Sequence, residues 1–190
     1  MRLILASASP RRLDLLARIG VLPSAVDPAD LDEAPHKAEL PRVYAQRISR
    51  EKAENIAARH SGAVILAADT VVAVGRRILP KAEDAATAQA CLELLSGRRH
   101  QVLTAVTVID AQGTARHRLS LTTLAFKRLS IAEITAYIAR NEWQGKAGGY
   151  AIQGHAEAFV RFLSGSHSGV IGLPLFETRA LLVSAGVLDA

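Results

Sequence analysis

The chain contains 190 residues, of which 49% are hydrophobic and 22% are charged. This length and composition predict one globular domain over residues 1–190 with a substantial buried core. The formal net charge of +5 indicates an anionic partner, and nucleotide, nucleic acid and acidic lipid all fit that charge. The single cysteine, Cys91, excludes an internal disulfide and a cysteine-rich zinc site, which predicts a reducing, cytoplasmic setting.

The hydrophobic stretches are not typical of export or of membrane insertion. The N-terminal apolar run is cut off by Arg11 and Arg12 and is too short for the hydrophobic part of a signal peptide. The run over residues 63–74 is interrupted by Asp69 and is too short to span a bilayer. We therefore expect no membrane partner.

The first twenty residues predict a strand followed by a helix. Leu3–Leu5 is a short apolar run typical of a buried strand. Ser9 and Pro10 then indicate a helix start, because serine is a favoured N-cap and proline fits the first helical position. The expected apolar stripe of this helix, which ends near Gly20, consists of Leu13, Leu16 and Ala17.

The next segments predict a loop, a long helix and a central strand. The polar stretch from Pro23 to Pro41 is expected to be a loop that forms a lid or rim. A helix is expected from about Leu40 to His60, with Ala45, Ile48 and Ile56 on its buried side. The continuous apolar run from Ala63 to Gly75 is typical of a strand buried on both faces.

The C-terminal half alternates helix and strand signals. Residues 84–97 predict an amphipathic helix, residues 100–109 and 116–126 predict paired strands, and the Ser130–Glu133 capping box opens a helix that runs to about Arg140. Alternating residues from Ala156 to Phe162 predict a strand, and a last helix is expected over residues 174–186. These signals together predict an α/β or α+β domain around one mixed sheet.

Two arginines stand directly after the predicted start of the first helix. The N-terminus of a helix carries partial positive charge, so Arg11 and Arg12 are unfavourable there by about 0.3 to 1 kcal/mol each at an exposed site. An anion bound to the free N–H groups of the first turn would reverse this effect, because guanidinium groups match phosphate oxygens. Alternatively, both arginines point into solvent.

Three further charged residues could each serve either a site or a purely structural role. Lys52 lies on the buried side of its predicted helix and either reaches solvent or serves a site. Lys81 follows a strand-like segment and is equally open to both interpretations. Asp69 lies within an apolar strand, where its carboxylate must be paired, bound to metal or backbone, or placed at a strand end that faces a cleft.

These basic residues, the buried acid and the glycine-rich loop over residues 145–154 predict a polyphosphate site with a divalent metal. The loop around Lys146 is not a P-loop, because the upstream glycine spacing is absent and Ala147 stands where a Ser or Thr would hold magnesium.

Six motifs, taken in order, resemble the Maf family of nucleoside triphosphate pyrophosphatases. They are LASASPRRLDLL, AADTVV, LPKAED, LSGRRHQV, GKAGGYAIQG and GLPLFET, and they extend over nearly the whole chain. The resemblance implies an elongated α/β fold similar to inosine triphosphate pyrophosphatases, with a mixed β-sheet, flanking helices and a cleft between two lobes. It also implies hydrolysis of a nucleoside triphosphate to the monophosphate and pyrophosphate with Mg²⁺ or Mn²⁺.

The resemblance assigns roles to individual residues. Asp69 would be the proton acceptor, or would order the metal and the attacking water, and Glu33 would assist the metal. The residues expected to bind substrate are Ser9, Arg11, Arg12, Lys52, Thr70, Lys81 and Gln153.

The motif versions resemble the branch of the family that acts on dTTP and UTP. Arg11, Thr70 and Gln153 occupy the positions that bear on base choice, and an amide such as that of Gln153 offers a donor and an acceptor to a base edge. Two positions depart from the family pattern: Ala82 rather than proline follows Lys81, and Gly169 replaces an asparagine.

Two other functions compete with the enzyme. One is a nucleotide-binding regulator of cell division, since the family is associated with inhibition of septum formation. The other is nucleic-acid binding, which the net charge suggests but which the low aromatic content of 4% disfavours, since single-strand binding uses stacking residues. The resemblance also implies a homodimer.

Overall fold

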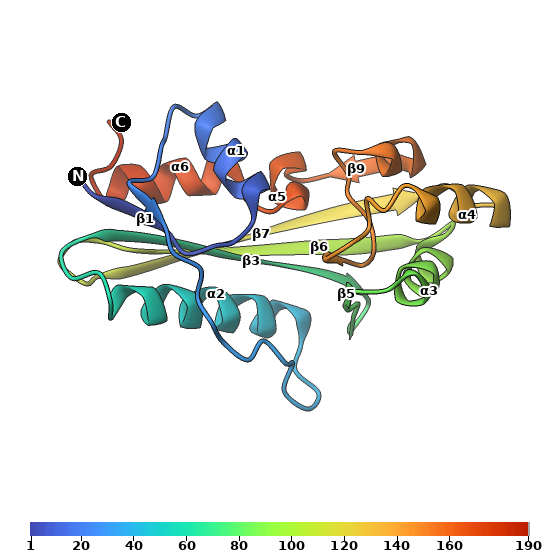
Figure 1. Cartoon of the computed structure of the whole chain (residues 1–190), viewed down its shortest axis with the longest axis horizontal. Coiled ribbons are helices and arrows are strands. Elements are labelled where there is room, and N and C mark those ends of the chain that lie inside the picture. The colour runs from blue at the N-terminus through green and yellow to red at the C-terminus, as the bar shows by residue number, and fades with distance from the viewer. Residues whose placement is uncertain (190) are drawn as a thin grey trace.

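Three long antiparallel strands run along the molecule and form the centre of a mixed sheet (Figure 1). The computed structural model describes residues 1–189. The central strands are β3 (Val64–Val74), β6 (Arg99–Ile109) and β7 (Ala115–Phe126). The sheet order is β2-β1-β3-β6-β7-β9, where β1 (Leu3–Leu5) is parallel to both β2 (Ala25–Val26) and β3, and β9 (Val160–Ser164) is antiparallel to β7. The predicted mixed sheet with flanking helices is confirmed.

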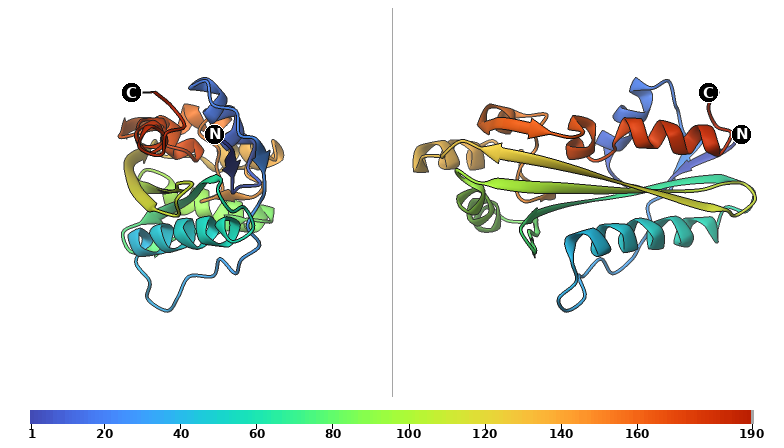
Figure 2. Two further views of the ribbon diagram at one scale, coloured as in Figure 1. Left: turned by 90° about the vertical axis from the view of Figure 1, so that its left-hand side faces the viewer. Right: turned by 180° about the vertical axis from the view of Figure 1, so that it is seen from behind.

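Helices cover both faces of the sheet. One face is covered by α2 (Pro41–Ala57), whose buried side packs on β3 and β6 (Figures 1 and 2). The opposite face carries α1 (Pro10–Arg18), α5 (His167–Ile171) and α6 (Leu175–Ser184). At the far end of the strands lie α3 (Ala85–Leu95), α4 (Ile131–Ala139) and the 3₁₀ helix η1 (His155–Phe159). Within residues 1–189, no helix has the length and hydropathy needed to cross a membrane.

The edge of β3 is left partly open, and this opening places the site. On the side away from β6, β1 pairs with Val64–Leu66 and β4 (Arg77–Ile78) pairs with Ala73 and Val74. Among the strands of residues 1–189, none pairs with this edge of β3 between those two segments. Asp69 and Thr70 lie in the gap. A separate small sheet, β5 (Lys81–Ala82) with β8 (Lys146–Ala147), lies beyond it.

Several predicted elements are confirmed with small changes of boundary. The long helix ends at Ala57, three residues before His60, and β3 is buried along almost its whole length. Asp84 caps α3 by accepting a hydrogen bond from the Thr87 N–H at 2.6 Å. The capping box of Ser130 and Glu133 opens α4.

Three predictions of local structure are wrong, and one helix was not predicted. The buried face of α1 contains Leu15 and Leu16, whereas Leu13 is exposed and Ala17 faces outward. The segment from Pro23 to Pro41 is not all loop, because it contains β2, which is stabilised by pairing with β1 rather than by a local pattern. Residues 155–159 form a 3₁₀ helix, so the strand begins only at Val160. The short helix α5 has no counterpart among the predicted elements.

Candidate active site

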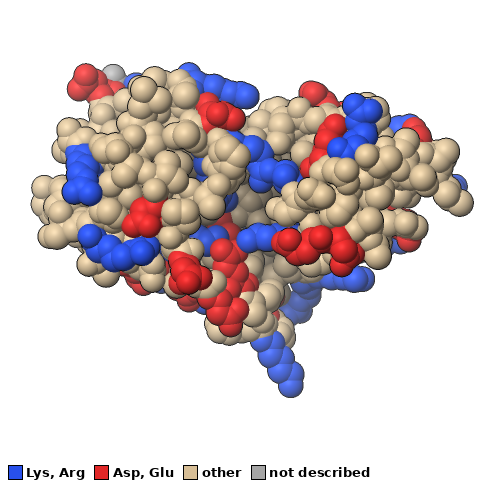
Figure 3. Space-filling model, in the orientation of Figure 1, with Lys and Arg blue, Asp and Glu red and all other residues tan. Residues whose placement is uncertain are grey.

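A cavity of about 420 Å³ lies where β3 is open, between α1, α2, β5 and the loop that follows β8. Figure 3 shows a depression near the middle of the molecule with Lys and Arg atoms along its walls and acidic atoms below it. All nine residues that the sequence singled out line this cavity: Ser9, Arg11, Arg12, Glu33, Lys52, Asp69, Thr70, Lys81 and Gln153. The cleft between two lobes is therefore present, and the roles of these residues stay predictions.

Two carboxylates meet at one lysine in the cavity. Lys52 Nζ donates a hydrogen bond to Asp69 Oδ1 at 2.8 Å and lies 2.7 Å from Glu33 Oε1. Lys81 Nζ donates to Glu33 Oε2 at 2.6 Å. Asp69 and Lys52 are 4% and 7% exposed, respectively. Because water scarcely reaches them, the Lys52 charge is compensated by Asp69 and Glu33, and the Asp69 charge is compensated by Lys52. No residue in the described range 1–189 hydrogen-bonds to Asp69 Oδ2, which leaves that oxygen for a ligand or water.

The positions of Lys52 and Glu33 follow from the segments that carry them. Lys52 extends from the buried face of α2, between Ile48 and Ile56, and therefore points at the sheet rather than at solvent. Glu33 is held by its own backbone, because its carbonyl accepts a hydrogen bond from the Tyr44 hydroxyl at 2.8 Å. Burial opposes ionisation of Glu33, but the charges and hydrogen bonds of Lys52 and Lys81 outweigh it and lower the pKa of Glu33 to about 2.

Arg12 faces into the protein. It lies on the same side of α1 as Leu15 and Leu16, and its guanidinium donates to the Gly172 carbonyl and to Ser7 Oγ, both at 2.8 Å. It also contacts Thr70 Oγ1 at 3.5 Å. Burial lowers the pKa of Arg12, against the opposing effect of the Asp69 charge. Arg12 is therefore fixed between α1, β3 and the end of α5, and it does not point into solvent.

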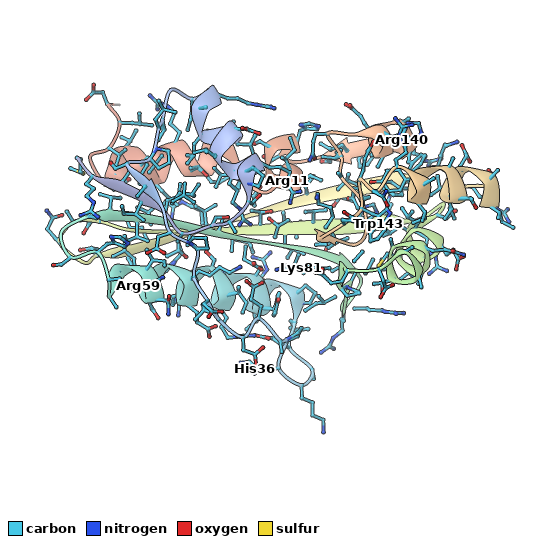
Figure 4. All side chains as sticks on the ribbon, in the orientation of Figure 1. Arg11, His36, Arg59, Lys81, Arg140 and Trp143 are labelled. Carbon is cyan, nitrogen blue, oxygen red and sulfur yellow. The ribbon has the colours of Figure 1, made fainter. Side chains whose placement is uncertain are left out.

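Arg11 and Lys146 line the same cavity without an acidic partner. Neither forms a salt bridge with any described residue, and Lys146 Nζ donates only to the Gln144 carbonyl at 2.7 Å. Figure 4 shows Arg11 above the central strands and Lys81 below them. Burial lowers the pKa of Arg11 and of Lys146, and the positive charge of Arg11 lowers that of Lys146 further. Lys146 is not among the predicted site residues, although the glycine-rich loop that carries it was predicted to belong to a polyphosphate site.

The hydroxyls of Thr70 on β3 and Thr104 on β6 link the sheet to α5. Thr104 Oγ1 lies 3.0 Å from Thr70 Oγ1 and 2.7 Å from the Gly169 carbonyl. The Gly169 N–H donates to Ser166 Oγ at 3.0 Å. Two side-chain hydroxyls therefore hold the main chain of Gly169, the position where the family pattern has an asparagine.

Glu33 and Asp69 are the acidic residues of the cavity lining. In residues 1–189 no group of three or more His, Cys, Asp or Glu side chains is arranged to hold a metal ion. However, the two carboxylates converge on one cation, the Lys52 ammonium. Magnesium is commonly held by one or two carboxylates together with substrate phosphates, so this donor set fits a metal that binds with a polyphosphate.

Comparisons with known proteins show which family this chain resembles. The sequence model of the family described as "Maf-like protein" matches residues 2–185. A dTTP/UTP pyrophosphatase of Rhodospirillum rubrum is 64% identical over 184 residues, with 97% of this chain and 88% of the relative covered. A dTTP/UTP pyrophosphatase of Novosphingobium aromaticivorans is 64% identical over 185 residues, with 97% and 92% covered. A solved HAM1 protein of Coxiella burnetii matches in fold with a TM-score of 0.51 and 15% identity, over 97% of this chain and 100% of that one.

Proposed function

This chain belongs to the Maf family, and from that membership we propose that it is a nucleoside triphosphate pyrophosphatase that acts on dTTP and UTP. The reaction breaks the bond between the α-phosphorus and the α–β bridging oxygen. The products are the nucleoside monophosphate and pyrophosphate. High identity to relatives named dTTP/UTP pyrophosphatase over nearly the whole chain supports this function.

The observation that carries the proposal is the balance of charge in the cavity. Five cationic side chains and two carboxylates line it: Arg11, Arg12, Lys52, Lys81 and Lys146 against Glu33 and Asp69. The excess of positive charge complements a triphosphate, and fixed cations stabilise the negative charge that develops on a departing pyrophosphate. A neutral or cationic substrate would not use this arrangement.

Asp69 is the group best placed to activate water. Its Oδ1 is bonded to Lys52, and its Oδ2 can accept a hydrogen bond from a water molecule. In the proposed step, the water oxygen bonds to the α-phosphorus, Asp69 takes a proton from that water, and the bridging oxygen leaves with pyrophosphate. Lys52 and Lys81 hold phosphate oxygens near this point, while Arg12 fixes the wall formed by α1.

A divalent cation, Mg²⁺ or Mn²⁺, belongs to the proposal. Glu33 and Asp69 would hold it together with phosphate oxygens of the substrate. When bound, the ion neutralises phosphate charge and polarises the phosphorus centre.

We assign base choice to Arg11, Thr70 and Gln153. Gln153 lines the cavity with an exposed side chain, and its amide offers both a donor and an acceptor to a pyrimidine edge. Thr70 lies beside Asp69 on β3 and is oriented by Thr104.

We also propose a cytoplasmic location and a homodimeric state for this chain. Light scattering of the purified chain tests the homodimer.

The test is pyrophosphate release from dTTP, UTP, CTP, 7-methyl-GTP and the purine triphosphates, with Mg²⁺ or Mn²⁺. We expect release from dTTP and UTP that is lost in Asp69→Asn and kept in Asp14→Asn, which changes an exposed aspartate of α1 outside the cavity. Tight nucleotide binding without release would favour the regulator of cell division instead. Salt-sensitive binding of DNA or RNA without nucleotide turnover would favour the nucleic-acid alternative.

A further inference from the structure

A buried histidine outside the cavity holds one of the residues in the cavity wall. Tyr150 lines the cavity, and its hydroxyl lies 2.8 Å from His100 Nε2. His100 extends from β6 and is 2% exposed. Its ring makes edge contacts with Phe126 and Tyr150, at centroid distances of 5.0 and 5.6 Å. A polar pair is thus buried within an aromatic cluster.

This pair leaves one polar atom without a partner. Burial lowers the pKa of His100 to about 4, against a smaller opposing effect of the Arg98 backbone, so the ring is neutral near pH 7. Donation from the Tyr150 hydroxyl to Nε2 places the ring proton on Nδ1, where the Arg98 backbone has only a weak effect and no group in the described structure lies in hydrogen-bond geometry. The reverse donation would also leave the Tyr150 hydroxyl hydrogen unpaired. A pair of phenylalanines would avoid this loss, so the pair calls for a purpose other than core packing.

The loop that carries Tyr150 also carries Gln153, and it is clamped at several points. Gly148 and Gly149 have φ of +68° and +70°, and a Cβ at these positions would lie 2.9 Å from Val72 Cγ1 and 3.0 Å from Ala88 Cα. The Ala151 N–H donates to the Tyr137 hydroxyl at 3.0 Å. These contacts fix the start of the loop against β3, α3 and α4, while the bond to His100 fixes the Tyr150 side chain on β6.

We propose that His100 is a positioning residue for base recognition: through its hydrogen bond to Tyr150 it fixes the cavity wall from which Gln153 reaches the nucleobase. This inference rests on the proposed function. His100 itself is absent from the cavity lining, so it acts only through Tyr150. Loss of the bond leaves the buried Tyr150 ring held by aromatic packing, without its polar anchor. The position of Gln153 then becomes less well defined, while the phosphate-binding residues on α1, α2 and β5 stay in place.

The test compares His100→Phe and Tyr150→Phe with wild type, using dTTP and CTP as the preferred and the disfavoured pyrimidine triphosphate. We expect the ratio of kcat/KM for dTTP to that for CTP to fall about fivefold, the size expected for one neutral hydrogen bond. The change should lie in KM, with kcat for dTTP nearly unchanged. The double variant should match either single variant, because both substitutions remove the same bond.

Three further variants separate positioning from a purely structural effect. His100→Gln, whose amide can still accept from Tyr150, should recover part of the ratio. Tyr150→Phe should add nothing in a Gln153→Ala background. His117→Phe is the matched control, since it removes a histidine–hydroxyl bond to Thr107 (2.9 Å) in the same sheet but away from the cavity, and it should leave the ratio unchanged.

An unchanged ratio, or an equal fall of kcat for every nucleotide, would overturn the inference. If His100→Phe does not fold, Tyr150→Phe decides alone, because it removes only a hydroxyl. If the wild-type protein releases pyrophosphate from no nucleotide, the proposed function fails. Calorimetric binding of non-hydrolysable α,β-imido dTTP and CTP then tests the same ratio for His100.

Discussion

Replacing Lys52 by methionine should destabilise the fold in a manner that depends on pH. Lys52 Nζ lies 2.8 Å from Asp69 Oδ1 and 2.7 Å from Glu33 Oε1. Methionine fills similar volume without charge, so the variant leaves two carboxylates facing each other in a buried site. Breaking a buried ion pair by removing one partner typically costs roughly 3–5 kcal/mol.

The lowered pKa of Glu33 bears on the size of this cost. Its pKa of about 2 in the folded chain lies about two units below that of a free glutamate, which corresponds to roughly 3 kcal/mol. Lys81 supplies part of that effect, and partial contact of Glu33 with water screens it. We therefore expect Lys52→Met to lower the free energy of unfolding by about 3 kcal/mol at pH 7, with Asp69 and Glu33 both contributing.

The sign of the pH dependence follows from the lowered pKa. A carboxylate with a lower pKa in the folded state stabilises the fold above its unfolded pKa, and this stabilisation disappears as pH falls through the folded value. The difference between wild type and Lys52→Met should therefore be largest above about pH 5 and fall by about half by pH 3.

Urea unfolding of both proteins at pH 7, 5 and 3 measures this difference. Lys127→Met is the matched control, because Lys127 forms an exposed ion pair with Glu133 whose loss should cost less than about 1 kcal/mol. If Lys52→Met were no more destabilising than Lys127→Met, or if its effect were constant from pH 7 to 3, the reasoning about the carboxylate pair would be refuted.

Three other variants probe the walls of the cavity. Arg12→Lys keeps the charge but loses the guanidinium fork, so it should raise KM for dTTP about tenfold; an unchanged KM would remove Arg12 from the phosphate site. Gly149→Ala should lower the urea midpoint by more than Gly75→Ala, because a Cβ at Gly149 meets Ala88 Cα at 3.0 Å whereas Gly75 has open space; equal midpoints would contradict this. Lys146→Gln should weaken inhibition by pyrophosphate about fivefold in a steady-state assay, and unaltered inhibition would show that Lys146 contacts no phosphate.

The sequence predicts the central elements because their signals are local. The apolar run that becomes β3, the amphipathic pattern of α3 and the Ser130 capping box each depend on residues within one segment. Some site residues can be predicted because a charge stands in an apolar pattern. A carboxylate in an apolar strand and a lysine on a buried helix face each need a compensating partner or ligand.

The errors arise where stabilisation comes from distant residues. Arg12, Leu15 and Leu16 have the helical spacing of a buried face, just as the predicted residues do, so spacing alone does not choose between the two sets. Arg12 faces inward because the carbonyl of Gly172, 160 residues later, accepts its hydrogen bond. The two residues of β2 form a strand only beside β1. No local pattern contains this information.

The continuity of β3, β6 and β7 along the molecule limits how it can move. β6 pairs with β3 and with β7 along their lengths, so a rigid-body rotation of one end of the molecule against the other would have to bend hydrogen-bonded strands. We therefore expect substrate access to be controlled by segments attached to these strands, above all residues 27–40, which carry Glu33. Hydrogen exchange should accordingly slow in that segment when nucleotide binds, while the amides of the long strands stay protected throughout.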